Sequence, residues 1–287
     1  MTTDEGKNGN SRDRLPVRLD AGVVENRHEG GVNWRLVVEV ADWPDFRPGQ
    51  FVMVSPGPRA EVERWDPLLP RPMAIYRLRR ERGSVQLEIL YKVSGRGTAL
   101  LAQTVSGQRV RLVGPLGRPF PAIEQGSARQ RILVGGGTGI ASLFDLAARA
   151  LEVASDPADV HVLLGARSAE DLLGADDFES LGVAVSFATE DGSRGHRGLV
   201  TELLEQCLEA EPDSAVYACG PTPMMERCSE ISLERSVTCM VSLENRMACG
   251  FGVCLGCAAP VGSEGYALVC RAGPVFDAAT VRWGEMP

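Results

Sequence analysis

Hydrophobic residues in the first part of the chain recur at every second position over short stretches, a pattern typical of strands with one buried face. Turn signals such as Pro48-Gly49 separate these stretches. One helix is expected at Thr98–Val105, with Thr98 as its N-cap. Many short strands with little helix predict a small β-barrel over residues 16–122. The predicted strands are Trp34–Val40, Phe51–Val54, Val85–Val93 and Val110–Val113.

The pattern changes near residues 125–127, after which short apolar runs alternate with helical periodicity. This alternation predicts a doubly wound parallel sheet over residues 127–235. Its strands are expected at Arg131–Val134, His161–Leu164, Val183–Ala188 and Ala215–Ala218. Its helices are expected at Ile140–Val153, Thr201–Leu208 and Pro223–Leu233, the last with Thr222 as its N-cap.

Two segments lie outside this pattern. Residues 236–287 are rich in Cys and Gly with little helical periodicity, and we expect a small third module there. Residues 1–15 are polar and aperiodic, and we expect a disordered tail. The predicted fold class is therefore multidomain, β plus α/β, with a barrel, a doubly wound nucleotide domain and a small C-terminal module. A length of 287 residues suits this division.

The composition is that of an ordinary globular protein, with 44% hydrophobic and 24% charged residues. With 30 basic and 38 acidic residues the formal net charge is −8, which argues against a nucleic-acid partner. No apolar run approaches the roughly 18–20 residues of a membrane span, and the polar start is no secretory signal. We therefore expect a cytoplasmic, soluble protein whose eight cysteines serve metal or redox roles rather than disulfides.

Four cysteines follow the C-x4-C-x2-C…C spacing of plant-type 2Fe–2S clusters. They are Cys249, Cys254, Cys257 and Cys270. Interleaved glycines let the backbone turn tightly and aim N–H groups at sulfur. A zinc site is the main alternative, although zinc usually takes paired C-x2-C knuckles and only one such pair is present. Four unrelated buried thiols are a further alternative. The remaining cysteines without ligand spacing, expected to be small buried hydrophobes, are Cys207, Cys228 and Cys239.

A glycine-rich turn joins the strand at Arg131–Val134 to the helix after it. Such a turn presents backbone N–H groups at a positive helix end, which suits a pyrophosphate, although a plain tight turn is an equal alternative. Ala218–Pro221 also follows a strand, at the edge where open α/β sheets bind ligands. By itself it could be a buried Cys before a Gly-Pro turn. The candidate nucleotide-binding residues are Gly135, Gly136, Gly137, Thr138, Gly139, Cys219, Gly220 and Pro221.

A candidate anion site lies in the predicted barrel. Arg71 beside the rigid Pro72 is suited to a diphosphate, and Gly97-Thr98 opens a short helix whose N-terminus is suited to the same anion. A surface arginine in a turn is the alternative.

The order of these parts resembles the ferredoxin-reductase family with a fused iron–sulfur module, and within it the electron-transfer subunits of class 1B dihydroorotate dehydrogenases. The resemblance extends over about residues 16–277 and is most specific in Ser242–Pro260 and Val269–Ala278. It implies FAD in a Greek-key barrel, NAD(H) as co-substrate, and an FMN-containing catalytic partner that oxidises dihydroorotate, with two copies of each subunit, in UMP biosynthesis. The FAD contacts it implies are Arg71, Pro72, Met73, Ala74, Leu90, Tyr91, Lys92, Gly97 and Thr98.

The sequence departs from this family at Ala74, where relatives usually carry Ser or Thr near the flavin N5, and its N-terminal tail is longer. Related chains serve hydrogenases, sulfide dehydrogenases or ferredoxin–nicotinamide transhydrogenases, which remain alternatives. So does a non-enzymatic module with a zinc knuckle. For the nucleotide, Arg167 would suit the 2′-phosphate of NADP, whereas Glu170 and Asp171 favour the free ribose of NAD.

No catalytic side chain is predicted. A nicotinamide gives two electrons as hydride, a cluster takes one at a time, and a flavin can do both, so no general base or nucleophile is needed. The sequence has no evident Ser/His/Asp set, and its three histidines have no ligand spacing. Phe251, Val253 and Leu255 lie between the predicted ligands and would either dock a partner or shield the cluster.

Overall fold

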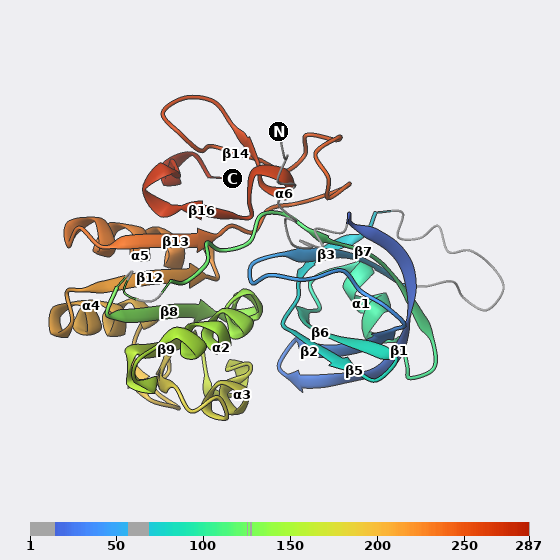
Figure 1. Ribbon diagram of the computed structural model, residues 1–287, viewed down its shortest axis with the longest axis horizontal. Helices are drawn as coiled ribbons and strands as arrows, with labels where there is room; N and C mark the ends of the chain where they lie inside the picture. The colour runs from blue at the N-terminus through green and yellow to red at the C-terminus, as the bar shows by residue number, and fades with distance from the viewer. Residues whose placement is uncertain (1–14, 57–68, 125, 127, 287) are drawn as a thin grey trace, which may run out of the picture.

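The computed structural model describes residues 15–56, 69–124, 126 and 128–286. The expected tail at 1–15 therefore lies outside the described residues except for Leu15. The first sheet has seven antiparallel strands in the order β4-β3-β7-β1-β2-β6-β5 and curls into a half-barrel (Figure 1). Its strands are β1 (Val17–Gly30), β2 (Asn33–Val40), β3 (Phe51–Pro56), β4 (Arg71–Ala74), β5 (Arg77–Glu81), β6 (Ser84–Lys92) and β7 (Arg109–Leu116).

Four of these strands match the predicted ones, and β1, β4 and β5 were missed. β4 and β5 form the two edges of the sheet, and β5 is mostly arginine, so neither shows the alternation of a half-buried strand. β1 is 14 residues long but buries only two of them, so its largely polar sequence does not indicate a strand. The barrel core lies between the strands, with Leu36, Leu87 and Leu112 at its centre.

The short helix of the barrel, α1 (Arg96–Ala102), begins two residues before the predicted start, so the assignment of Thr98 as N-cap is wrong. Gly95 precedes the helix in an extended conformation. The Thr98 hydroxyl instead reaches back from the first turn, accepting hydrogen bonds from the backbone N–H groups of Ser94 (3.0 Å) and Gly95 (3.2 Å). Thr98 therefore satisfies two backbone N–H groups of the chain just before the helix.

The second sheet is parallel except for its last strand and has the order β11-β10-β9-β8-β12-β13-β16. α2 and α3 pack on one face, and α4 and α5 on the other, so the sheet is doubly wound as predicted. Its strands are β8 (Gln130–Gly136), β9 (Val160–Ala166), β10 (Ala184–Thr189), β11 (His196–Arg197), β12 (Ser214–Cys219), β13 (Thr238–Ser242) and β16 (Val275–Asp277). The helices are α2 (Phe144–Val153), α3 (Ala175–Glu179), α4 (Val200–Ala210) and α5 (Thr222–Glu234).

Two helix starts differ from the prediction. The helix expected from Ile140 begins as a 3-10 turn, η1 (Gly137–Ser142), and becomes α-helical only at Phe144. Tight 3-10 turns are frequent at helix starts. Thr222 is the first residue of α5 rather than its N-cap, and Pro221 precedes it.

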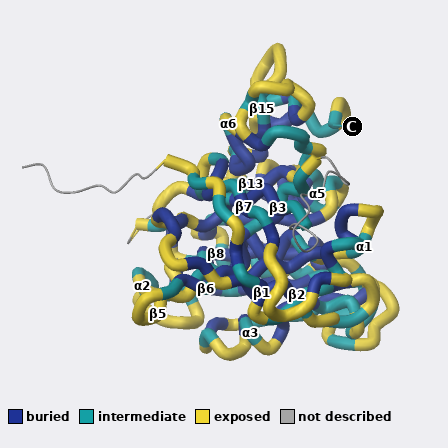
Figure 2. The backbone as a smooth tube through the Cα atoms, turned by 90° about the vertical axis from the view of Figure 1, so that its right-hand side faces the viewer, coloured by how far each residue is buried: buried dark blue, intermediate teal, exposed yellow. Residues whose placement is uncertain are grey.

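The C-terminal segment shares a sheet and a core with the α/β domain. β13 and β16 both belong to the parallel sheet, although the sequence placed them in the last module. Cys257, Val269 and Cys270 are buried in the same core as α4 and α5. The tube is dark at the start of α6 (Val269–Ala272) and lighter beyond it (Figure 2). The hairpin of β14 (Ala258–Ala259) and β15 (Ala267–Leu268) contributes Ala259 to that core, and Leu268 packs against it. Within the described ranges, no helix is long and apolar enough to cross a membrane.

Candidate functional site

A cavity of about 270 Å³ lies where the half-barrel, the parallel sheet and the C-terminal segment meet. Ligand pockets typically measure about 300–1,000 Å³, so this one encloses only part of a dinucleotide. Eight of the nine residues predicted to contact FAD line it, together with Thr138 and Cys219 of the predicted nucleotide turns. The eight are Arg71, Pro72, Met73, Ala74, Leu90, Tyr91, Lys92 and Thr98.

Gly97, the ninth predicted residue, lies beneath Arg71 instead of lining the cavity. A Cβ atom at Gly97 would come within 2.5 Å of Nη2 of Arg71, so only glycine leaves room for the guanidinium there. Arg71 also donates a hydrogen bond to the carbonyl oxygen of Leu69. The guanidinium is thereby held at the start of α1, where it can pair with a phosphate.

Sequence reasoning missed the contribution of the segment before the cluster cysteines. Ser242, Leu243, Glu244 and Met247 line the same cavity. Glu244 is exposed to solvent in the open cavity, but the protein atoms packed around its carboxyl raise the pKa of that group, and the charge of Lys92 opposes the rise. These residues belong to the Ser242–Pro260 motif. Within it, sequence reasoning assigned a site role to the cysteines and not to these four residues.

A second, larger cavity of about 720 Å³ opens at the carboxyl edge of the parallel sheet. Gly136, Gly137 and Pro221 of the predicted turns line it. Thr201 and Pro223 also line it, from the first turns of α4 and α5, which orient positive helix ends toward the space. The lining residues that sequence reasoning missed include Gly165, Ala166, Glu190, Gly198, Leu199, Met224 and Arg227.

The other predicted glycines serve packing. Gly135 and Gly139 are buried, and a Cβ atom at Gly139 would come within 2.5 Å of the carbonyl oxygen of Cys219. This close approach lets η1 lie directly against the end of β12. Gly220 likewise packs against Met224 and Gly136. Thus the glycine-rich turn brings the two predicted motifs together, with part of it facing each cavity.

Arginines in the larger cavity are paired with carboxylates. Arg167 Nη2 lies 3.1 Å from Asp171 Oδ2, and Arg227 is paired with Glu205 and with Glu230 (3.0 Å to the latter). Arg167, which would suit a 2′-phosphate, is thus neutralised by Asp171. Lys92 lines both cavities, so they adjoin.

The four candidate ligand cysteines gather in two pairs. Cys257 and Cys270 are buried, with their sulfur atoms 3.2 Å apart. Cys249 accepts hydrogen bonds from Cys254, both backbone and side chain, and from the N–H groups of Phe251 and Val253. Burial raises the pKa of the Cys249 thiol, but these hydrogen bonds outweigh it and lower the value to about 6.

This donor set fits an iron–sulfur cluster. Backbone N–H groups aimed at a thiolate are the interactions that tune such clusters. In the part of the chain that the structure describes, no three His, Cys, Asp or Glu side chains are grouped to hold a single ion. Cys228 and Cys239 are buried in the core as predicted, whereas Cys207 is half-buried beside His161 (3.5 Å).

Comparison with known proteins agrees with this geometry. Residues 133–230 match the oxidoreductase NAD-binding domain, and residues 244–282 match the iron–sulfur cluster binding domain of dihydroorotate dehydrogenase B. The electron transfer subunit of dihydroorotate dehydrogenase B (NAD(+)) from Bacillus caldolyticus is 37% identical, over 94% of this chain and 98% of its own length. The chain belongs to this family of electron-transfer subunits.

Other relatives extend the comparison. The homologue of this subunit from Aquifex aeolicus is 34% identical over 91% of this chain and 96% of its own length. A chain of the NADH-dependent reduced ferredoxin–NADP oxidoreductase has a TM-score of 0.78 and 28% identity, covering 93% of this chain and 91% of that one. The ferredoxin reductase of carbazole 1,9a-dioxygenase, at 20% identity, a TM-score of 0.63 and coverage of 78% and 68%, shares the fold. The predicted family and fold class are thus confirmed, and the chain is an NAD-linked oxidoreductase subunit with an iron–sulfur domain.

Proposed function

We propose that this chain passes electrons between NAD(H) and an FMN-containing dihydroorotate dehydrogenase catalytic subunit, through FAD and a 2Fe–2S cluster, in the synthesis of UMP. One observation carries the proposal. The smaller cavity is lined at once by Tyr91 of the barrel, by Thr138 of the parallel sheet and by Met247 of the cysteine segment. A group bound there would touch all three parts of the chain.

The cavity residues divide by the part of FAD they suit. Arg71 would neutralise the diphosphate, with Thr98 beside it at the start of α1. Pro72, Met73, Ala74, Leu90 and Tyr91 give largely apolar walls for the ring system. Ala74 offers no hydroxyl toward that ring, so a hydrogen bond there would come from the backbone or from other polar residues of the lining, such as Ser142 and Ser242.

The larger cavity would hold NAD(H). Gly136 and Gly137 with the starts of α4 and α5 would bind its pyrophosphate. When bound, a flavin takes hydride from a nicotinamide and gives up electrons one at a time, as an iron–sulfur cluster requires. The chain's own work is to hold these groups in contact and to exclude water. Val32 and Asn33 close the cavity from the barrel side.

The cluster type rests on the pairing of the cysteines. A two-iron cluster takes two protein ligands on each iron, so two separate pairs of sulfur atoms match it. Cys249 with Cys254 would hold one iron, and Cys257 with Cys270 the other. The buried pair lies in the shared core, while Cys254 is exposed. The cluster would therefore reach from the interior to the surface.

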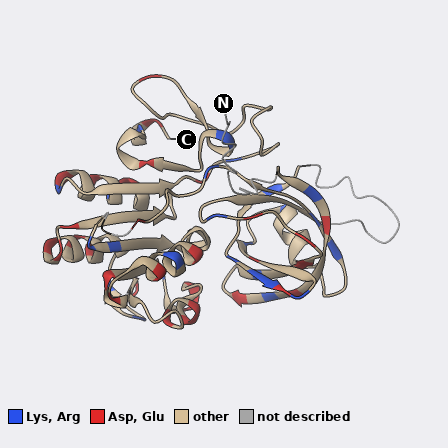
Figure 3. Cartoon of the chain, in the orientation of Figure 1, with Lys and Arg blue, Asp and Glu red and all other residues tan. Residues whose placement is uncertain are grey.

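The partner would dock at this exposed end. Phe251, Val253 and Leu255 are 56%, 74% and 64% exposed, and residues 247–263 contain no Asp, Glu, Lys or Arg (Figure 3). Exposed apolar residues gathered in this way are typical of protein interfaces, and the exposed Arg271 lies beside them at Gly252. We propose that the FMN subunit covers it, in an assembly with two copies of each chain, as the family resemblance implies.

Replacement of Cys254 by Ser tests this function. In the purified complex, NADH should still bleach the flavin, while dihydroorotate oxidation coupled to NAD+ reduction should collapse. The matched variant Cys228→Ser alters a buried cysteine outside the cluster and should keep both reactions. Unchanged coupled turnover in Cys254→Ser would contradict the proposed electron route.

The likeness to the NADH-dependent reduced ferredoxin–NADP oxidoreductase supports a second candidate, a reductase subunit that serves ferredoxin chemistry. Its 28% identity is lower than the 37% shared with the dihydroorotate dehydrogenase subunits. Copurification of the native complex separates the two. An FMN protein active on dihydroorotate supports the first candidate, and a partner carrying further iron–sulfur clusters supports the second.

A further inference from the structure

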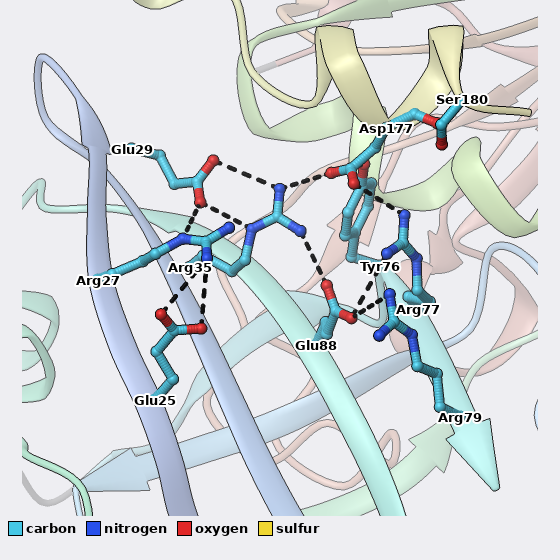
Figure 4. A network of polar contacts seen from close by, with 10 residues as sticks. All are labelled: Glu25, Arg27, Glu29, Arg35, Tyr76, Arg77, Arg79, Glu88, Asp177 and Ser180. Carbon is cyan, nitrogen blue, oxygen red and sulfur yellow. Dashed lines mark hydrogen bonds and ion pairs between the residues drawn. The ribbon is translucent and has the colours of Figure 1, made fainter.

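The half-barrel and the parallel sheet are joined by an ion-pair network centred on Asp177 of α3 (Figure 4). Its carboxylate accepts hydrogen bonds from Arg35 Nη2 (2.6 Å), Tyr76 Oη (2.9 Å) and Arg77 Nη2 (3.0 Å). All three donors belong to the barrel. A single carboxylate of the α/β domain thus carries three bonds between the domains.

Arg35 is positioned for this contact by the barrel alone. It is 5% exposed, and it donates to Glu88 through Nη1 (2.8 Å) and to Glu29 through Nε (2.8 Å). These two carboxylates lie on β6 and β1, so they hold the guanidinium whether or not the other domain is in place. The remaining amino group, Nη2, points at Asp177. A preorganised guanidinium loses little rotamer freedom when that last bond forms.

Aromatic packing beneath the network makes the same connection. The ring centroids of Tyr76 and Phe144 in α2 are 4.8 Å apart, and those of Phe144 and Phe178 in α3 are 5.2 Å apart. The guanidinium of Arg77 sits over the Phe144 ring at 4.2 Å. The polar contacts and the apolar cluster together hold α2 and α3 against the barrel.

The network is close along the chain to both walls of the larger cavity. That cavity has one wall from each domain, with Asn33 on the barrel side and Arg167 and Asp171 on the other. Asn33 is two residues before Arg35 in β2, and Asp171 is six residues before Asp177 in the connection from β9 to β10. We therefore expect a change in the Arg35–Asp177 contact to change the distance between the two walls.

We propose that Asp177 is a positioning residue that latches the two domains at the separation needed to bind NAD(H) between them. The inference rests on the proposed function only in that the larger cavity takes NAD(H). A pocket whose walls are correctly spaced for only a fraction of the time binds its ligand more weakly by that same fraction. Loss of the latch should therefore weaken nucleotide binding while the residues that touch the nucleotide are unchanged.

Two variants separate this role from general stability. Asp177→Asn weakens the link between the domains, whereas Asp20→Asn makes the same change in an ion pair with Arg111 that lies wholly within the barrel and outside the network. In the complete holoenzyme, we expect Asp177→Asn to raise the KM for NADH in ferricyanide reduction, and the Kd for NAD+ by calorimetry, roughly tenfold, the effect of losing a hydrogen bond to a charged group. Asp20→Asn should change both by less than about twofold, well below the effect of such a loss.

Hydrogen–deuterium exchange gives a readout that does not depend on activity. Residues 169–180 should exchange faster in Asp177→Asn and at the native rate in Asp20→Asn. Tyr76→Phe, which removes one hydroxyl and keeps the ring packing, should raise the KM by a smaller factor and add nothing in combination with Asp177→Asn. This milder variant provides the test if Asp177→Asn fails to fold.

Native KM and exchange in Asp177→Asn and Tyr76→Phe would overturn the latch. Equal effects of Asp177→Asn and Asp20→Asn would also overturn it, because they would reflect stability alone. A wild-type holoenzyme that does not oxidise NADH would instead contradict the proposed function.

Discussion

The guanidinium of Arg71 lies against Gly97, so that a Cβ atom there would come within 2.5 Å of its Nη2 atom. Gly97→Ala should therefore push the flexible arginine away from the start of α1 without disturbing the helix. We expect FAD affinity to fall roughly tenfold, as for loss of one charge-assisted contact, measured by flavin fluorescence on titration. Gly95→Ala is the matched control, because a Cβ atom at Gly95 meets nothing within 4 Å. Equal affinity in both variants would contradict the role given to Arg71.

Glu244 gives a pH-dependent prediction. Because burial raises the pKa of its carboxyl in the folded chain, the folded state binds that proton more tightly than the unfolded state. The stabilisation is present below the unfolded value of 4.5 and is lost as pH rises through the folded pKa. Glu244→Gln should therefore raise Tm at pH 8 and leave it unchanged at pH 4. Replacement of the exposed Glu152 by Gln should leave Tm unchanged at both pH values. An equal rise in Tm at pH 8 in this control would show that the effect is not specific to Glu244.

The cofactor motifs could be predicted from the sequence because their residues lie close together along the chain. The cysteine spacing and the run from Arg71 to Ala74 are local patterns of this kind. Glu244 was missed because no local pattern marks it. Its carboxylate lines the cavity only because the chain turns back toward the cavity after β13. Arg35 and Asp177 are 142 residues apart, and no local pattern indicates that they meet. β1 was missed since only two of its 14 residues are buried.

Asp171 should determine nucleotide preference. It neutralises Arg167 at 3.1 Å, so the arginine is already paired where a 2′-phosphate would need it. Asp171→Asn should free Arg167 and raise kcat/KM for NADPH relative to NADH about tenfold or more, the typical effect of a charge-assisted hydrogen bond. The double variant Asp171→Asn with Arg167→Gln should lose that gain. An unchanged ratio in the single variant would show that the pair does not select the nucleotide.

The exposed apolar residues between the ligand cysteines should bind the partner. Replacing both Phe251 and Val253 by Ser should weaken association with the FMN subunit by a factor of about ten or more, measured by surface plasmon resonance, because apolar anchors carry much of the energy of an interface. Leu233→Ser provides the control, since Leu233 is 68% exposed but lies on α5. Loss of the partner with the Leu233 variant alone would place the interface on the α/β domain.

The central claim is that the four cysteines hold two irons through which electrons leave singly. Analysis of iron and acid-labile sulfide in the native complex, with electron paramagnetic resonance after anaerobic reduction by NADH, tests it most directly. The account predicts two irons and two sulfides per chain beyond any in the partner, and a paramagnetic signal that NADH elicits and Cys257→Ser abolishes. One zinc per chain, without sulfide and without a signal, would contradict it.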